Sequence, residues 1–142
     1  MAATRPAFTS YDQWLQIGVA FIGAGIVAEM HGRALAATSG ARFVGACDPD
    51  TAKAEKIAKK FGGKVFKKLE KLLEDESVHA VHVLTPVPLH VPIALKALRA
   101  GKHVLVEKPV AMSATEIRQL RLAAKQCRRV CMPAHNYIYV PS

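Results

Sequence analysis

A glycine-containing turn between an apolar run and a helix-forming segment is the feature that most constrains how this chain can fold. Residues 17–22 are apolar and β-prone, and residues 23–28 read GAGIVA, which fits the pattern G-x-G-x-x-G/A. In that pattern Gly23 permits a sharp turn from strand to helix, and Ala28 is small enough for the helix to pack closely on its strand. Gly25 has no Cβ to obstruct a ligand that approaches the backbone. The segment therefore predicts a strand, a tight turn and a helix, with a ligand at the turn.

The start of the predicted helix is suited to an anion. Its first N–H groups have no partner within the helix, and the positive end of the helix dipole lies beside them. In strand–turn–helix units of this kind the anion is the pyrophosphate of a dinucleotide. The residues predicted to contact it are Gly23, Ala24, Gly25, Ile26 and Val27.

The size and composition of the chain are those of one globular domain. Its 142 residues are 51% hydrophobic and 22% charged, enough for a single core and unlike a disordered chain. No apolar run reaches the roughly 18 residues of a membrane span, and residues 1–16 lack the apolar stretch of a secretory signal. We expect residues 1–16 to be an N-terminal leader that could be flexible, and residues 17–142 to form the domain. We expect no second domain and no membrane partner.

Cysteine and histidine give no sign of a disulfide framework or a metal site. The three cysteines, Cys47, Cys127 and Cys131, are odd in number and include no C-x-x-C pair. His79 and His82 stand three residues apart in an apolar run, so on a strand they would point to opposite faces. We therefore predict no metal and a reducing, cytoplasmic location.

Apolar runs alternate along the chain with segments of helical periodicity. Strands are predicted over residues 17–22, 41–47, 64–66, 78–84, 102–106 and 128–132. Helices are predicted over residues 25–37, 51–61 and 67–74, in a segment that ends before Gly101, and from residue 113 onward. This alternation predicts an α/β protein with a three-layer Rossmann fold and a doubly wound parallel sheet of about six strands.

Residue types at the helix ends support these boundaries. Gly62 and Gly101 are typical of the position just after a helix. Ser113 and Glu116 have the spacing of a capping box, in which each side chain accepts from the other's backbone N–H. The residues of the last helix that we expect to face the sheet are Ile117, Leu120 and Ala124.

The end of the second predicted strand carries a carboxylate at a suitable distance from the turn. Asp48 lies 25 residues after Gly23, close to the spacing of about 20 expected for the acid that accepts the hydroxyl groups of an adenine ribose. With Pro49 and Asp50 it also forms a sequence suited to a turn or a helix N-cap. We predict that Asp48 and Pro49 contact the cofactor. A carboxylate here would repel a 2′-phosphate, so NAD is favoured over NADP.

Two further strand ends fall on the other side of the predicted crevice, beyond the point where strand order reverses. Thr85 and Pro86 follow the fourth strand, and Glu107, Lys108 and Pro109 follow the fifth. The ammonium of Lys108 could hydrogen-bond a substrate oxygen and stabilise the charge that develops during hydride transfer. Pro109 restricts the backbone, and a cis Lys108–Pro109 bond is compatible with such a turn. The alternative interpretation is a polar strand end followed by an ordinary turn.

The formal net charge is +9, and eight lysines lie between residues 53 and 71. Such a cluster could bind a polyanion. The segment has no arginine cluster of the kind that reads nucleic-acid bases. We therefore interpret the lysines as the solvated faces of helices and predict no nucleic-acid partner, although their charge would help to attract an anionic cofactor.

Together these motifs resemble the N-terminal domain of the Gfo/Idh/MocA (glucose–fructose oxidoreductase / inositol dehydrogenase / MocA) family. The similarity covers residues 17–141 and is strongest in residues 97–109, which end in VLVEKP, and in the glycine turn with His31. The resemblance implies an NAD(P)-dependent oxidoreductase that acts on sugars, cyclitols and related polyols. It implies that Lys108 is the catalytic lysine. The cofactor-site positions that it implies are Gly23, Gly25, Asp48, Thr85, Pro86, His90 and Glu107. We also predict that Lys108 and Asn136 contact the cofactor.

The sequence departs from the family pattern in three respects. Val87 stands where many members have Asn, and Ile138 stands where they have Arg. The family's second domain, which supplies most of the substrate pocket and an Asp/His pair beside the lysine, has no counterpart in residues 1–142. We expect a truncated domain that binds its dinucleotide and transfers hydride poorly alone, with a sugar or polyol substrate and a second copy or a partner chain to supply the missing domain. The alternative is a non-catalytic NAD-binding regulatory module, for which Lys108 would be dispensable.

Overall fold

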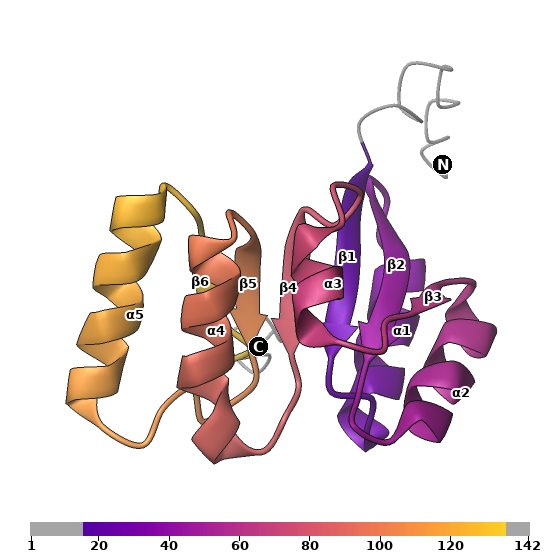
Figure 1. Ribbon diagram of the computed structural model, residues 1–142, viewed down its shortest axis with the longest axis horizontal. Helices are drawn as coiled ribbons and strands as arrows, with labels where there is room; N and C mark the ends of the chain where they lie inside the picture. Colours follow the sequence, from indigo (N-terminus) through magenta and orange to yellow (C-terminus); the bar gives the residue numbers. More distant parts are fainter. Residues whose placement is uncertain (1–15, 136–142) are drawn as a thin grey trace, which may run out of the picture.

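A parallel six-stranded sheet runs through the centre of residues 16–135, the part of the chain that the structure, a computed structural model, describes (Figure 1). The strands are β1 (Ile17–Ile22), β2 (Ala41–Cys47), β3 (Lys64–Val65), β4 (Ala80–Val83), β5 (His103–Val106) and β6 (Cys131–Pro133). The helices are α1 (Ile26–Ala36), α2 (Thr51–Phe61), α3 (Leu69–Glu74), α4 (His90–Arg99) and α5 (Ala114–Cys127), with a 3-10 turn over Val87–Leu89. The predicted α/β fold with a parallel sheet is confirmed. Within residues 16–135 no helix has the length and hydrophobicity that crossing a membrane requires.

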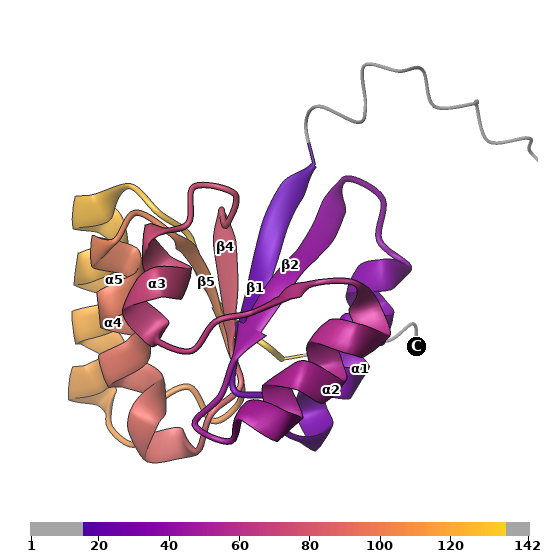
Figure 2. The ribbon, with the colours of Figure 1, turned by 45° about the vertical axis from the view of Figure 1, so that its right-hand side comes forward.

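The order of the strands explains where the two halves of the chain meet. The order is β3-β2-β1-β4-β5-β6, and all neighbouring strands are parallel. β1 therefore lies beside β4, although two strands separate them along the chain. Helices α1 and α2 lie on one side of the sheet, and α3, α4 and α5 lie on the other (Figure 2). In open sheets of this kind, ligands bind outside the carboxyl ends of the strands where the order reverses, which here is between β1 and β4.

The central strand β1 is buried on both faces. Val19 and Phe21 belong to the hydrophobic core beneath α1 and α2. Ala20 and Ile22 belong to the core on the opposite face. The uninterrupted apolar run in β1 is typical of a parallel strand that helices cover on both sides, and it fixes the glycine turn at the end of the most buried strand.

The signals at the helix ends are mostly confirmed. Helix α2 ends at Gly62, which adopts φ +75°, and Gly101 after α4 adopts φ +79°. Ser113 caps α5 by accepting a hydrogen bond from the N–H of Glu116. The Glu116 carboxylate differs from the predicted capping box, because it accepts from the N–H of Met112 instead of that of Ser113.

Three predicted details in the second half of the chain are wrong. Strand β6 begins at Cys131 and not at residue 128, because α5 continues to Cys127 and Arg128 then turns the chain in the left-handed region (φ +52°). Strand β4 is confined to Ala80–Val83, shorter than predicted. Ile117 is 45% exposed, and Ala123 is buried in the core in addition to Leu120. Periodicity locates an element, whereas tertiary packing decides its ends and the exact rim of its buried face.

A buried lysine joins the start of β5 to the turn before β4. Lys102 is 8% exposed, and its ammonium donates hydrogen bonds to the backbone oxygens of Asp75 (2.9 Å) and Val78 (2.7 Å). Burial lowers the pKa of Lys102, as low-dielectric surroundings do for an ammonium. The side chain therefore has a structural role at the edge of the sheet opposite the glycine turn.

Replacing Lys102 by methionine should lower the free energy of unfolding by about 1–3 kcal/mol, because two backbone oxygens would lose a charged donor while the side chain keeps its length. Urea unfolding followed by circular dichroism would measure the loss. The matched control is Lys96→Met at an exposed position of α4, which should change stability by less than about 0.5 kcal/mol. Equal stability of the two variants would contradict the structural role of Lys102.

Candidate functional site

The turn between β1 and α1 has the geometry that its glycines predict. Gly23 adopts φ +96°, and a Cβ there would lie 2.7 Å from the backbone oxygen of Leu84. Gly25 has an ordinary φ of −75°. Apart from its chain neighbours, no atom of the described chain lies within 4 Å of the position that a Cβ of Gly25 would take. The fold thus requires Gly23, whereas the space beside Gly25 is free for a ligand.

The first turn of α1 is open to solvent. Gly25 is the N-cap residue, and no side chain within residues 16–135 caps the helix there. Ile26 and Val27 are 89% and 38% exposed, although both are large and apolar. An uncapped helix N-terminus with free N–H groups is a ready site for an anion.

The carboxylate of Asp48 holds this turn from the end of β2. Its Oδ2 accepts a hydrogen bond from the N–H of Ala24 (2.7 Å), and its Oδ1 accepts from the N–H of Asp50 (2.8 Å). The N-cap role at α2 belongs to Asp50, whose side chain accepts from the N–H of Ala52. Asp48 therefore has the turn role that the sequence left open, and its contact with a ribose stays a prediction.

The loops after β4 and β5 are joined by a buried histidine. The ring of His90 is 1% exposed, with Nε2 2.6 Å from the backbone oxygen of Thr85 and Nδ1 2.9 Å from that of Pro109. Both ring nitrogens are thus occupied by backbone carbonyl groups, and the predicted contact of His90 with a cofactor stays untested. The Oγ1 atom of Thr85 is buried and is the one buried side-chain polar atom without a hydrogen-bond partner among the described residues.

The segment after β5 presents a carboxylate and a lysine. Glu107 is partly buried, and its Oε2 accepts a hydrogen bond from the backbone N–H of Lys108 (3.0 Å). The Lys108 side chain is exposed, and the Lys108–Pro109 bond is cis. Of the remaining predicted site residues, Pro49 and Pro86 are exposed at the ends of β2 and β4, and Asn136 lies outside the described residues.

Two histidines that were not predicted as site residues extend from Glu107: His31 contacts the carboxylate and His82 contacts His31. The Nε2 atom of His31 on α1 is 3.0 Å from Oε1 of Glu107, and its Nδ1 atom is 3.0 Å from Nδ1 of His82 on β4. As predicted, His79 points elsewhere, since its Nδ1 accepts from the N–H of Gly18. No group of three potential metal ligands comes together within residues 16–135. The sequence signal for His31 was its place in the turn motif, whereas nothing in the pattern of β4 singled out His82.

These side chains line a groove of about 720 Å³ beside α1. Its lining comes mainly from α1, from β1, β4, β5 and β6, and from the segments after β5 and β6. Helix α1 lies on the same side of the sheet as α2 (Figure 2). The lining of the groove combines apolar side chains such as Met30 and Met132 with His31, Glu107 and Lys108. The groove therefore extends from Val27, in the first turn of α1, to Lys108.

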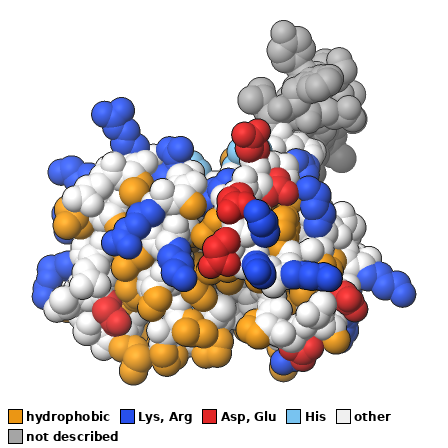
Figure 3. Space-filling view, in the orientation of Figure 1, with side chains coloured by type: hydrophobic (Ala, Val, Ile, Leu, Met, Phe, Trp, Pro, Cys, Tyr) orange, Lys and Arg blue, Asp and Glu red, His pale blue; other side chains and the backbone are white. Residues whose placement is uncertain are grey.

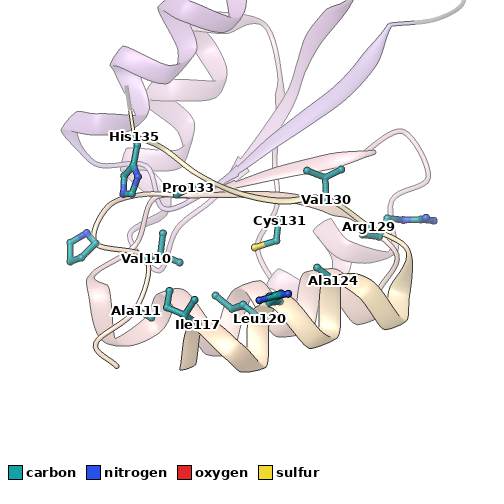
Figure 4. Close-up of a pocket in the computed structure, with 12 residues that line it drawn as sticks. Val110, Ala111, Ile117, Leu120, Ala124, Arg129, Val130, Cys131, Pro133 and His135 are labelled. Atoms are coloured by element: carbon teal, nitrogen blue, oxygen red, sulfur yellow. The ribbon is translucent and has the colours of Figure 1, made fainter. Parts of the chain in front are cut away.

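A second groove, of about 680 Å³, lies between α5 and β6 (Figure 4). Its lining is mostly apolar and includes Ile117, and the sulfur of Cys131 points into it. Burial raises the pKa of the Cys131 thiol, which disfavours the reactive thiolate. None of the residues predicted to bind the cofactor lines this groove.

The lysine-rich segment does not form a uniform positive surface. Figure 3 shows blue side chains scattered over one face of the molecule, with carboxylates between them over α3. Four of the eight lysines form ion pairs, with Asp50, Glu29, Asp75 and Glu74: these are Lys53, Lys60, Lys64 and Lys71. Lys60 and Arg33 lower the pKa of Glu29 to about 2. The pairing supports the interpretation of these lysines as solvated helix faces.

The doubly wound sheet and the open glycine turn define a protein of the dinucleotide-binding class. The family described as "Oxidoreductase family, NAD-binding Rossmann fold" (GFO_IDH_MocA) matches residues 17–135. The chain belongs to this Gfo/Idh/MocA family, and the matched residues are its NAD-binding domain.

Similar proteins share this domain. Glucose-6-phosphate 3-dehydrogenase of Bacillus subtilis is 34% identical over 122 residues, which are 86% of this chain and 34% of the relative. The structure of GenD2 from gentamicin A biosynthesis, in complex with NAD, aligns with a TM-score of 0.88 and 32% identity over 99% of this chain and 39% of that one. KijD10, a 3-ketoreductase from Actinomadura kijaniata in complex with NADP and TDP-benzene, aligns with a TM-score of 0.86 and 30% identity over 89% of this chain and 39% of that one. The chain thus spans little more than a third of the length of these relatives.

The stability of the protein should fall in acid partly because of His82. Burial, and secondarily the neighbouring His31, lower the pKa of His82 to about 3. The unfolded chain, with an ordinary histidine pKa of about 6.5, binds more protons between these values, so the free energy of unfolding should fall by up to about 1.4 kcal/mol per pH unit as the pH drops below about 6.5. Urea unfolding at several pH values should show a shallower slope for His82→Asn. The control His135→Asn, at an exposed position, should keep the original slope, and identical slopes for all three proteins would contradict this assignment.

Proposed function

We propose that this domain holds NAD in an oxidoreductase that transfers a hydride between the nicotinamide and a hydroxyl-bearing carbon of a sugar, cyclitol or related polyol. The observation that carries the proposal is the uncapped N-terminus of α1 with free space at Gly25, next to strand ends that present Asp48, Thr85 and Lys108. The domain match and the dinucleotides in GenD2 and KijD10 support it.

The glycine turn fits the phosphate groups of a dinucleotide. The backbone at Gly25 is accessible because no described atom beyond its chain neighbours occupies the place of a Cβ. The N–H groups at the start of α1 would donate to the phosphate oxygens, and the helix dipole would add attraction. Asp48 keeps the N–H of Ala24 engaged, so a contact within the protein orders the turn, which would reduce the entropy lost on binding.

The loops after β4 and β5 fit the nicotinamide end. The buried Oγ1 of Thr85 has hydrogen-bonding capacity that no other described residue uses, and a polar ligand group would satisfy it. When bound, the nicotinamide supplies or accepts the hydride. The exposed ammonium of Lys108 would hydrogen-bond the substrate oxygen and stabilise its developing negative charge.

The substrate class comes from the family and not from this site. The Bacillus subtilis relative is a glucose-6-phosphate 3-dehydrogenase and KijD10 is a 3-ketoreductase, and oxidation or reduction at a carbinol carbon is common to both descriptions. Hydride transfer also needs a pocket that orients the substrate and excludes water. The 142 residues assayed alone are therefore expected to bind the dinucleotide and to turn over a polyol slowly.

Gly25→Ala should leave stability unchanged and weaken NADH binding by about tenfold or more, because its methyl group meets no protein atom but occupies the ligand's approach to the backbone. Titration of the purified chain with NADH, followed by nicotinamide fluorescence, would measure the affinity. Gly40→Ala provides the opposite control: its φ of +82° makes alanine strained, so stability should fall by about 1 kcal/mol while binding is retained. A chain that bound neither NADH nor NADPH at millimolar concentration would contradict the proposed function.

Asp48 is expected to set the preference for NADH over NADPH. Removing its charge in Asp48→Asn should shift the ratio of the two affinities by about tenfold toward NADPH, since the repulsion of a 2′-phosphate would be lost. Parallel titrations with the two dinucleotides measure this ratio. The ratio is insensitive to loss of the bond to Ala24, because that bond affects both ligands equally. An unchanged ratio would show that the Asp48 carboxylate does not face the ribose.

A further inference from the structure

His82, His31 and Glu107 form a continuous hydrogen-bonded chain that crosses the boundary between the two halves of the fold. His31 belongs to α1, in the half built on β1, β2 and β3. His82 belongs to β4, and Glu107 follows β5, in the other half. The contacts of His31 with both partners, each 3.0 Å, therefore join the two halves beside Lys108.

The hydrogens on the two rings determine the direction of these bonds. A carboxylate only accepts, so the hydrogen between His31 and Glu107 lies on Nε2 of His31. Between the two Nδ1 atoms, one ring must donate and the other must accept. A neutral His31 accepts from Nδ1–H of His82. A protonated His31 donates instead, and His82 then carries its hydrogen on Nε2.

The His82 ring is fixed in place and remains neutral. It stacks on the buried ring of Phe21, with ring centres 5.2 Å apart and planes inclined by 16°. Its pKa of about 3, lowered mainly by burial, keeps it neutral at physiological pH. A neutral ring carries one hydrogen, so the tautomer of His82 reports whether His31 has gained a proton.

At the other end of this series of hydrogen bonds, Glu107 holds the backbone at Lys108. One oxygen of Glu107 contacts His31, and the other accepts from the N–H of Lys108. With both oxygens engaged, the carboxylate has one preferred orientation and the Lys108 segment is held with it. The titratable groups that share the groove with His31 come from β4, the segment after β5 and the segment after β6: they are His82, Glu107, Lys108 and His135.

We propose that His31 and His82 are positioning residues, which act through Glu107 to hold the Lys108 segment beside the nicotinamide, and that proton uptake by His31 reverses the bond between the two histidines. The identity of the ligand, a nicotinamide beside Lys108, rests on the proposed function. The bond reversal rests on the geometry of the three side chains alone, so the two parts are tested separately.

The bond reversal is tested by NMR on the full chain labelled with ¹⁵N-histidine. Long-range N–H correlation spectra, recorded as the pH is lowered until the His31 ring is protonated, distinguish the two tautomers and the protonated ring. We expect His82 to stay neutral throughout, with its hydrogen on Nδ1 while His31 is neutral and on Nε2 once His31 is protonated. A His82 ring that becomes protonated before His31, or that keeps one tautomer after His31 has gained its proton, would overturn the proposal.

The positioning role is tested by a matched pair of variants. In His82→Asn the amide can still donate to His31, whereas His82→Leu has a similar size and no donor; both lose the stack on Phe21. We expect the leucine variant to bind NADH about 5- to 20-fold more weakly than the asparagine variant, which should stay within about threefold of the unaltered chain. Circular dichroism would establish that both variants fold, and if His82→Leu does not, the pair His31→Gln and His31→Leu replaces it with the same expectation.

The outcomes separate the two proposals. Equal NADH binding by the donor-bearing and donor-free variants, with normal binding by the unaltered chain, would overturn the positioning role and leave the proposed function intact. Failure of the unaltered chain to bind either dinucleotide would overturn the proposed function and the positioning role with it. The tautomer measurement needs no dinucleotide and decides the bond reversal in every case.

Discussion

Two backbone hydrogen bonds at the end of β1 determine where the groups of the candidate site lie. The N–H of Gly23 bonds the oxygen of Cys47 at the end of β2, and the oxygen of Ile22 accepts from the N–H of Leu84 after β4, each at 2.8 Å. The chain is held on both sides where it leaves the sheet, and the positive φ of Gly23 provides its exit. Because β2 and β4 end beside this exit, the side chains that follow them border the same turn.

Side chains that bond backbone groups then order the loops around that exit. Asp48 holds Ala24 across from β2, and Glu107 holds Lys108 after β5. Each bond has a charged acceptor, which makes it stronger than an ordinary backbone bond. The loops thus owe their shape to protein contacts, and a ligand would meet a site that is largely formed before binding.

The fold could be predicted from the sequence because the connections between strands and helices carry recognisable turn and capping residues. The turn of residues 23–28, the left-handed glycines and the helix cap at Ser113 depend on neighbours within a few residues, and all were recovered. The contact between His31 and His82 joins residues 51 apart along the chain, and no periodicity encodes it. The same limit explains Asp48: the sequence showed a carboxylate at the right spacing, but only the fold shows that Ala24 is its partner.

The buried position of His90 affects how a substitution of this residue should be interpreted. Its ring touches the carbonyl oxygens of Thr85 and Pro109, on loops that follow two different strands. Shortening this side chain would release both loops together, so weaker ligand binding by such a variant would measure a change in loop spacing and not a lost ligand contact. A place in a sequence motif and direct contact with a ligand are therefore separate properties, and in this domain a buried residue can shape the site without lining it.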